Sequence, residues 1–230
     1  MKNTTINLGV IKKVASALGE LNERVIFVGG AVVSLYSNDP AADDVRPTKD
    51  VDISLEIFSV GDLEKLRLDL IGKGFRQRMN EKVICRFFYD DVTVDVMSTQ
   101  AIGWAPSDKW YGPGFKQLQE IKIENVFVRI LPLAYFLAYK FDAYHDRGGK
   151  DPRTSHDFED IIYILDNRMD LVETILNSPN EVLDFLKVEF QNMLSDSVSQ
   201  EAIAGNLYYE TRTDRFKFLM NKLKQIVEGI

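Results

Sequence analysis

Cysteine is almost absent from this chain of 230 residues, in which Cys85 is the single example. One cysteine cannot form an internal disulfide, and it cannot build a metal site that needs several thiolates. The chain also has only two histidines, whose positions do not match a metal-ligand spacing. These absences exclude disulfide-stapled proteins and cysteine-rich metal sites, and they predict a reducing compartment.

Long hydrophobic runs are absent as well. The longest apolar stretch covers residues 131–139 and ends at Lys140, so it is too short to cross a bilayer. Near the amino terminus, Lys12 and Lys13 lie inside an amphipathic pattern rather than ahead of an apolar core, which does not fit a signal peptide. We therefore expect a soluble cytoplasmic protein with no membrane partner.

Positive charge is in deficit, because 28 lysine and arginine residues stand against 35 aspartate and glutamate residues, for a net charge of -7. This balance argues against a protein that coats nucleic acid through bulk electrostatics, although a local basic groove could hold one phosphate-rich partner. Hydrophobic residues make up 45% of the chain, enough for a sizeable core in one larger domain or two small ones.

Hydrophobic periodicity divides the chain into a mixed half and a helical half. In the first half we predict helices over 8–21, 31–36 and 61–72, strands over 25–28, 50–57, 83–89, 92–97 and 126–130, and an ordered loop over 98–115. Asp90 and Asp91 form a tight turn between two of these strands. The second half shows only helical spacing, over 133–145, 155–166, 170–176, 181–193 and 211–227. The prediction is an α+β protein with a mixed domain in residues 1–131 and a helical domain in residues 132–230.

Three aspartates carry the strongest chemical signal. Asp50 and Asp52 are separated by one residue in a predicted strand, so both side chains project from the same side of it. Like charges held this close repel, and a shared divalent cation removes the repulsion. Asp95 lies between valines in a second strand, where it could complete a two-metal site and accept the proton of an attacking hydroxyl. The alternative is an ordinary half-buried strand with acids that face solvent.

Gly29 and Gly30 follow a predicted strand and precede a predicted helix. A small-residue turn at such a junction lets a phosphate approach backbone N–H groups and the positive end of the helix. The pair by itself is equally consistent with an ordinary tight turn.

Two other protein classes use an Asp-x-Asp pair. Phosphatases of the haloacid dehalogenase type carry a threonine two residues after the second aspartate, where this chain has Ser54. Metal-dependent glycosyltransferases hold a nucleotide diphosphate with such a pair, but within a larger doubly wound domain. The upstream glycine pair argues against the first class, and the short chain with its helical second half argues against the other.

A second polar block runs from Lys140 to Asp160 and interrupts otherwise apolar helix faces. Lys140 and Arg147 share one face of the first helix, while Asp157 and Asp160 lie one turn apart on the next. We predict that Lys140 contacts a nucleotide phosphate, with Arg147 beside it and the two aspartates holding both bases in place. A salt-bridge network that ties the two helices together explains Arg147, Asp157 and Asp160 equally well.

Together these residues resemble the nucleotidyltransferases of the AbiEii type, which belong to the DNA polymerase β-like superfamily. Several members act as toxins of abortive-infection toxin–antitoxin pairs. The resemblance rests on Gly29-Gly30, the motif from Arg46 to Asp52, Asp95, and the block from Lys140 to Asp160, with support from residues 108–111 and 128–138. It covers roughly residues 20–170.

The resemblance implies a nucleotidyltransferase fold, in which a mixed sheet is flanked by helices and followed by a helical part. It implies that Asp50, Asp52 and Asp95 bind Mg²⁺, with Mn²⁺ as an alternative, and that an NTP is the substrate. The implied nucleotide-binding residues are Gly29, Gly30, Thr48, Lys140, Arg147, Asp157 and Asp160. The chain departs from the pattern in one respect: its gap between the glycines and the aspartate pair is longer than in the shortest superfamily members.

These observations favour an enzyme that moves a nucleoside monophosphate from an NTP to a hydroxyl, with tRNA as the expected acceptor and a cognate antitoxin as an expected partner. A basic helix from Arg212 to Lys224 could contact RNA, although a solvated amphipathic helix explains it better. Two alternatives stay open. An aminoglycoside adenylyltransferase would suit the acidic net charge, whereas a non-catalytic nucleotide-binding module would not need three intact carboxylates.

Overall fold

The computed structural model describes residues 2–78, 83–147 and 151–230. The chain forms two compact units, one from residues 1–32 and 44–132 and the other from residues 33–43 and 133–230. The helical unit therefore includes a short segment that lies far ahead of it in the sequence, whereas the boundary predicted after residue 131 assigned that segment to the first domain.

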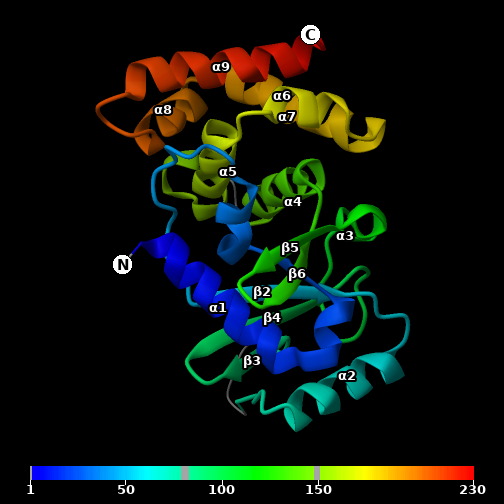
Figure 1. The fold of residues 1–230 in the computed structure, drawn as a ribbon. Helices are drawn as coiled ribbons and strands as arrows, with labels where there is room; N and C mark the ends of the chain where they lie inside the picture. Colours follow the sequence, from blue (N-terminus) through cyan, green and yellow to red (C-terminus); the bar gives the residue numbers. More distant parts are fainter. Residues whose placement is uncertain (1, 79–82, 148–150) are drawn as a thin grey trace. The chain divides into compact units, whose positions relative to one another are not determined.

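The first unit is built on a six-stranded mixed sheet with the order β3-β4-β2-β1-β6-β5 (Figure 1). Its strands are β1 (Val25–Val28), β2 (Asp50–Leu55), β3 (Arg86–Tyr89), β4 (Val92–Ser98), β5 (Gln119–Ile123) and β6 (Val126–Ile130). β2 runs parallel to β4 and β1 runs parallel to β6, while the other neighbours are antiparallel. All of β1 is buried, so the core of this unit surrounds the central strands. The predicted α+β class is confirmed.

Helices pack against this sheet and connect its strands. In α1 (Asn3–Leu18) the buried residues Ile11, Val14 and Leu18 form one apolar stripe, and the helix contacts β2 and β6. The 3₁₀ helix η1 (Gly19–Arg24) leads into β1. The helix α2 (Val60–Gly72) is capped by Ser59, whose Oγ accepts a hydrogen bond from Asp62 N. The short turns α3 (Tyr111–Gly114) and η3 (Phe115–Gln117) lie at the end of the predicted loop.

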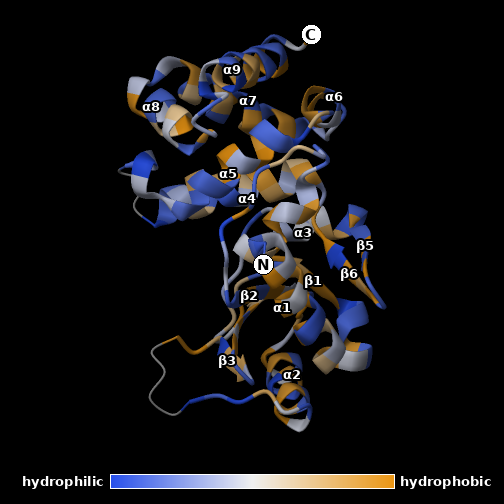
Figure 2. Ribbon diagram, turned by 60° about the vertical axis from the view of Figure 1, so that its left-hand side comes forward, coloured by the Kyte–Doolittle hydropathy of each residue, from blue (hydrophilic) through white to orange (hydrophobic). Residues whose placement is uncertain are grey.

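The second unit contains the helices that follow β6. They are α4 (Leu133–Asp146), η4 (Pro152–Thr154), α5 (His156–Asn167), α6 (Leu171–Leu176), α7 (Asn180–Ser195), α8 (Ser197–Asn206) and α9 (Arg212–Glu228). Figure 2 shows hydrophobic and hydrophilic colour on the same helices, as expected of amphipathic helices that pack on one another. Among the described residues, no helix has the length and hydropathy needed to span a membrane.

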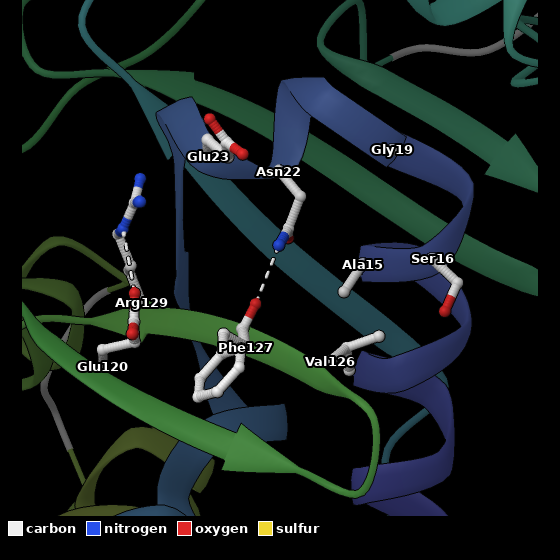
Figure 3. A pocket seen from close by; sticks show the side chains of 9 residues that line it. All are labelled: Ala15, Ser16, Gly19, Asn22, Glu23, Glu120, Val126, Phe127 and Arg129. Carbon is white, nitrogen blue, oxygen red and sulfur yellow. Dashed lines mark hydrogen bonds and ion pairs between the residues drawn. The ribbon is translucent and has the colours of Figure 1, made fainter.

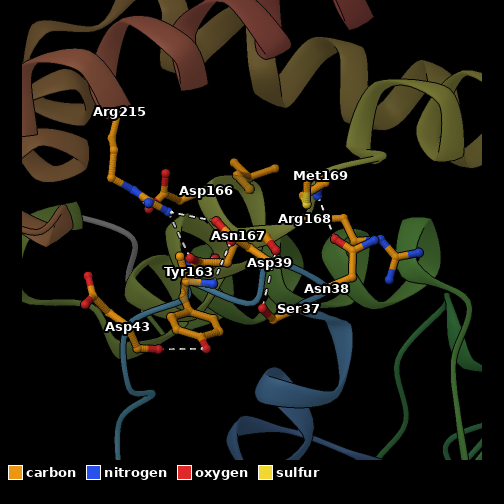
Figure 4. Close-up of polar contacts among 12 residues, drawn as sticks. Ser37, Asn38, Asp39, Asp43, Tyr163, Asp166, Asn167, Arg168, Met169 and Arg215 are labelled. Carbon is orange, nitrogen blue, oxygen red and sulfur yellow. Dashed lines mark hydrogen bonds and ion pairs between the residues drawn. The ribbon is translucent and has the colours of Figure 1, made fainter. Parts of the chain in front are cut away.

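The 3₁₀ helix η2 (Gly30–Tyr36) and the polar segment after it lead the chain from the first unit into the second. Asn38 N donates to the carbonyl of Asn167 at the end of α5, at 3.2 Å. The Tyr163 hydroxyl of the same helix donates to Asp43 O at 3.1 Å (Figure 4). The long gap between the glycine pair and the aspartate pair thus carries the chain to α5 and back.

Some predicted bounds differ from the structure, and two elements were not predicted. The strand predicted over 83–89 begins only at Arg86, and the helix predicted over 31–36 is 3₁₀. Strand β5 was not predicted; it is a five-residue edge strand in which only Ile123 is buried, and Ile121 and Ile123 are its only apolar residues. Helix α8 was not predicted either, because only two of its ten residues are buried.

Candidate active site

A row of charged side chains crosses three neighbouring strands of the first unit. Asp52 on β2 and Asp95 on β4 are register partners in the parallel pair. Asp95 is also the partner of Arg86 on the antiparallel neighbour β3. Residues paired directly across strands point to the same side of a sheet, so the three side chains share one face. The structure thus brings two of the predicted carboxylates together on adjacent strands.

Asp50 extends this row by two positions along β2. The intervening Val51 is buried, while Asp50 is exposed and Asp52 is half-buried. This alternation places both aspartates on the face opposite to Val51 and Ile53, as the Asp-x-Asp spacing predicted. In the register with β4, Asp50 is paired with Thr93.

Gly29 makes room for the Asp52 carboxylate. It follows β1, whose last residue Val28 pairs with Asp52, and its φ of 74° lies in the left-handed region that favours glycine. A Cβ atom at Gly29 would stand 1.8 Å from Asp52 Oδ2 and 2.7 Å from Asp52 Cγ, far inside contact distance. This glycine is therefore required for the position of a candidate catalytic side chain. Gly30 follows as the first residue of η2.

Thr48 lies in the loop before β2, and Asn7 of α1 fixes this loop. The Asn7 side chain has no exposed surface; its Nδ2 donates to Arg46 O at 2.9 Å and its Oδ1 accepts from Thr48 N at 3.0 Å. Thr48 Oγ1 in turn accepts from Asp50 N at 3.2 Å. Asn7 was not among the predicted site residues, although the sequence contains a signal for it: this polar residue occupies the apolar stripe of α1 one turn before Ile11.

Arg86 forms a bidentate ion pair with Asp95 that was not predicted from the sequence. Arg86 Nε donates to Asp95 Oδ1 and Nη2 donates to Oδ2, both at 2.8 Å. The two side chains are 29% and 16% exposed, so the pair is partly shielded from water. The tight turn at Asp90 and Asp91 could have predicted this pair. It makes Tyr89 and Val92 register partners, and three residues further from the turn on each strand Arg86 lies opposite Asp95.

The carboxylates of this row fit a divalent cation only in part. Carboxylate oxygens are ligands that Mg²⁺ prefers, so the chemistry of Asp50 and Asp52 fits the predicted ion. Asp95 does not fit in this arrangement, because both of its oxygens accept hydrogen bonds from Arg86. Within residues 2–78, 83–147 and 151–230, no three histidine, cysteine, aspartate or glutamate side chains are placed to hold a metal ion together.

Cys85 lies close to this row of charges and is 8% exposed. Burial raises the pKa of its thiol, and the negative charge of Asp95 raises it further, with a smaller contribution from Asp52. The positive charge of Arg86 acts in the opposite direction. Because the thiolate is the reactive form, the only cysteine of the chain is held in its less reactive state.

The four candidate residues of the helical unit form an ion cluster. Lys140 Nζ on α4 donates to Asp157 Oδ1 at 3.0 Å and to Asp160 Oδ2 at 2.7 Å, both on α5. Arg147 Nη1 donates to Asp157 Oδ2 at 2.9 Å, and 67% of its side chain is exposed. The predicted motif continues into residues 148–150, which lie outside the described residues.

Lys140 is charged although it is buried. Burial alone would lower the pKa of Lys140, but the charges of Asp160 and Asp157 outweigh burial and raise it. Its ammonium group ties α4 to α5, which is the salt-bridge arrangement weighed against a phosphate contact. Because the side chain is only 3% exposed, it presents little surface to a ligand. Nucleotide binding by these four residues stays a prediction.

Two surface hollows of the first unit are lined by other residues. One, of about 370 Å³, lies between α1, η1 and the β5–β6 hairpin, and Arg129 and Glu120 line it (Figure 3). Asn22 Nδ2 donates to Phe127 O there at 2.8 Å. The second hollow has a similar volume and shares Glu23 and Arg129 with the first. Their linings mix both signs of charge and include none of the candidate residues.

Comparison with solved structures finds similar chains at low identity, one of which is described as nucleotidyltransferase-like. An antigenic nucleotidyltransferase-like protein from Paracoccidioides brasiliensis has a TM-score of 0.48 and 18% identity, over 86% of this chain and 93% of that chain. JHP933 from Helicobacter pylori has a TM-score of 0.47 and 11% identity, over 100% and 97%. The antibiotic-resistance factor ANT(2'')-Ia has a TM-score of 0.42 and 13% identity, over 98% and 94%.

Sequence comparison gives the family of the chain. A search of the curated proteins finds no significant match. A family model described as nucleotidyl transferase AbiEii toxin, type IV TA system, matches residues 14–223, which is nearly the whole chain. The chain therefore belongs to the AbiEii family of nucleotidyltransferase toxins of type IV toxin–antitoxin systems.

Proposed function

We propose that this nucleotidyltransferase moves a nucleoside monophosphate from an NTP to a hydroxyl group of tRNA in the cytoplasm and releases pyrophosphate. Family membership supports an NTP as substrate and an antitoxin as partner; the tRNA acceptor and the Mg²⁺ ion are our proposal. The observation that supports it best is the pairing of Asp52 with Asp95 on adjacent parallel strands, with Asp50 beside them and Gly29 against Asp52.

Each residue of the row has a proposed role. Asp50 and Asp52 hold the cation, Asp95 completes the site once its oxygens are released from Arg86, and Mn²⁺ can replace Mg²⁺ there. When bound, the ion neutralises charge on the triphosphate and favours attack at the α-phosphate. The turn at Gly29 and Gly30 offers backbone N–H groups to the phosphates, and Thr48 orients Asp50 through its hydrogen bond. Asp95 is the proposed base that takes the proton of the attacking hydroxyl.

The proposal is tested by a labelling experiment. The protein is incubated with each α-labelled NTP and Mg²⁺, in parallel with total tRNA, with a panel of aminoglycosides, and alone. We expect label on tRNA with wild type, and a loss of at least ~100-fold with Asp50→Ala. Asp69→Ala is the matched control, because Asp69 is also an exposed acid, on α2 and outside the row. Both side chains are exposed, so the fold is expected to tolerate both changes.

The possible results separate the candidate functions. If the Asp50→Ala variant still labels tRNA, the proposed active site is wrong. Label on an aminoglycoside would show that the acceptor is a small cationic molecule and not tRNA. The net charge of -7 favours such an acceptor. Nucleotide binding without label on any acceptor would indicate a non-catalytic binding module.

A further inference from the structure

The Arg86–Asp95 pair is unusual for a row of acids that handles a cation. A guanidinium group carries a positive charge, and it binds both oxygens of the carboxylate in the fork geometry that makes such pairs strong. A cation at Asp95 would need the same lone pairs that Arg86 now uses. The two states of Asp95, paired with Arg86 or bound to a cation, therefore exclude each other to a large extent.

The position of Arg86 in the sheet permits the pair to open. Arg86 is the first residue of β3, the edge strand that pairs with β4, and the bridge on the other side of β3 joins Phe88 to Arg76, not Arg86. Its backbone N–H is satisfied locally, because it donates to Val83 O at 3.1 Å. The side chain is 29% exposed, so it can turn towards solvent or towards an anion without breaking the sheet.

We infer that Arg86 is a positioning residue that regulates loading of the cation site by holding Asp95 until an anionic nucleotide takes the guanidinium over. This inference rests on the proposed function, because it takes the row of aspartates as the cation site. Without nucleotide, Arg86 competes with the cation for Asp95. A triphosphate gives the guanidinium another anionic partner, so nucleotide and cation bind cooperatively.

The test measures cation binding rather than activity. Mn²⁺ is titrated into the full-length protein without nucleotide, and free Mn²⁺ is followed by electron paramagnetic resonance. We expect Arg86→Gln to bind Mn²⁺ about tenfold more tightly than wild type, within the usual range of coupling between sites. Arg86→Lys keeps the charge but cannot bind both oxygens, so an intermediate affinity is expected.

A matched control separates competition from general electrostatics. Arg129 lies on β6 of the same sheet, with 33% of its side chain exposed, and it forms a looser ion pair with Glu120, at 3.8 Å. Arg129→Gln removes the same charge from the unit and should leave Mn²⁺ affinity within about twofold of wild type. A non-hydrolysable NTP should increase the Mn²⁺ affinity of both proteins, and the increase should be several-fold larger for wild type than for Arg86→Gln.

The inference and the proposed function fail in different ways. If Arg86→Gln folds and leaves Mn²⁺ affinity unchanged or weaker, while Asp50→Ala abolishes binding, the pair is purely structural and the cation site stands. If neither wild type nor any variant binds Mn²⁺, the proposed cation site is wrong, and so is the inference that Arg86 regulates it. Should Arg86→Gln not fold, Arg86→Lys decides, because unchanged affinity in that variant overturns the inference.

Discussion

At the scale of single residues, Gly29 shows how closely the backbone approaches the candidate chemistry. Gly29→Ala would place a methyl group on the Asp52 carboxylate at a backbone angle that disfavours side chains. We expect this change to lower the free energy of unfolding by at least ~1–2 kcal/mol and to reduce nucleotidyl transfer by ~100-fold or more, because Asp52 must move. Urea unfolding and the labelling assay measure the two effects.

Gly9→Ala is the matched control for this prediction. Gly9 lies in α1, and a Cβ atom there would meet nothing within 4 Å. The exchange should raise the free energy of unfolding by about 0.5–1 kcal/mol, since alanine favours a helix over glycine. Full activity of Gly29→Ala would show that the present position of Asp52 is not needed for transfer.

Cys85 provides a chemical probe of the same row. Because Asp95 helps to raise the pKa of this thiol and Arg86 lowers it, Asp95→Asn should lower the thiol pKa twice over, by removing a negative charge and releasing the arginine. We expect faster alkylation of the single cysteine by iodoacetamide near pH 8, and a pH profile shifted to lower pH. Asp69→Asn should leave the profile in place, and an unchanged profile in Asp95→Asn would contradict the proposed electrostatics.

At the scale of secondary-structure elements, two lysines fasten α5 to its neighbours. Lys222 of α9 donates to the carbonyls of Leu165, Asp166 and Arg168, at 3.0, 3.2 and 2.9 Å. These are carbonyl groups at the end of α5, which an isolated helix leaves unsatisfied. The ammonium group thus works as a cap that comes from another helix.

Lys222→Met should lower the free energy of unfolding by ~1–3 kcal/mol, because it leaves buried carbonyls without a donor. Lys217→Met, on an exposed position of the same helix, should stay within about 0.5 kcal/mol of wild type. Burial lowers the pKa of Lys222, so the unfolded chain holds this proton more tightly than the folded one. Wild type should therefore gain stability relative to Lys222→Met as the pH rises towards 10.5, which urea unfolding at several pH values can measure.

Lys140 should show the opposite dependence on pH. Its pKa is raised in the folded state, so its stabilising charge is present below the unfolded pKa near 10.5 and is lost as the pH rises through the folded value. Lys140→Met removes the ammonium group that both buried aspartates share and should cost ~3–5 kcal/mol near neutral pH. That cost should shrink only above pH 10.5, and adding Asp160→Asn should recover part of it. Equal stability of Lys140→Met and wild type would contradict the ion cluster as a structural tie.

At the scale of the whole molecule, the second unit depends on a distant segment. Residues 33–43 supply Tyr36, whose ring stacks on Phe136 at 4.4 Å between centroids, and Asn38, which bonds to the end of α5. A fragment of residues 133–230 should therefore melt at a lower temperature than the same fragment with a saturating 33–43 peptide. A peptide with Asn38→Ala should stabilise less. No effect of the native peptide would show that the helical half is independent, as the predicted boundary after residue 131 implies.

The sequence predicted more of the elements than of their mutual contacts. Helical and strand periodicity predicted the division into a mixed half and a helical half, and the Asp-x-Asp spacing predicted that Asp50 and Asp52 share one face of a strand. Both features depend only on residues that are close in the sequence. The clamp of Asn7 on Arg46 joins α1 to a loop about 40 residues away, which periodicity does not encode. The partner of Asp95 could have been predicted, because the tight turn fixes the register that places Arg86 opposite it. The motif alone does not indicate this pair, because Arg86 lies on the neighbouring strand.

The detour of residues 33–43 also has a consequence for synthesis of the chain. Ser37 bonds to Asn167, and these residues are separated by 130 positions. At translation rates of ~5–20 residues per second, α5 leaves the ribosome on the order of ten seconds after the segment that it must hold. Throughout that interval residues 33–43 lack their partners on α5, although β1 and β2 on either side of them can already pair.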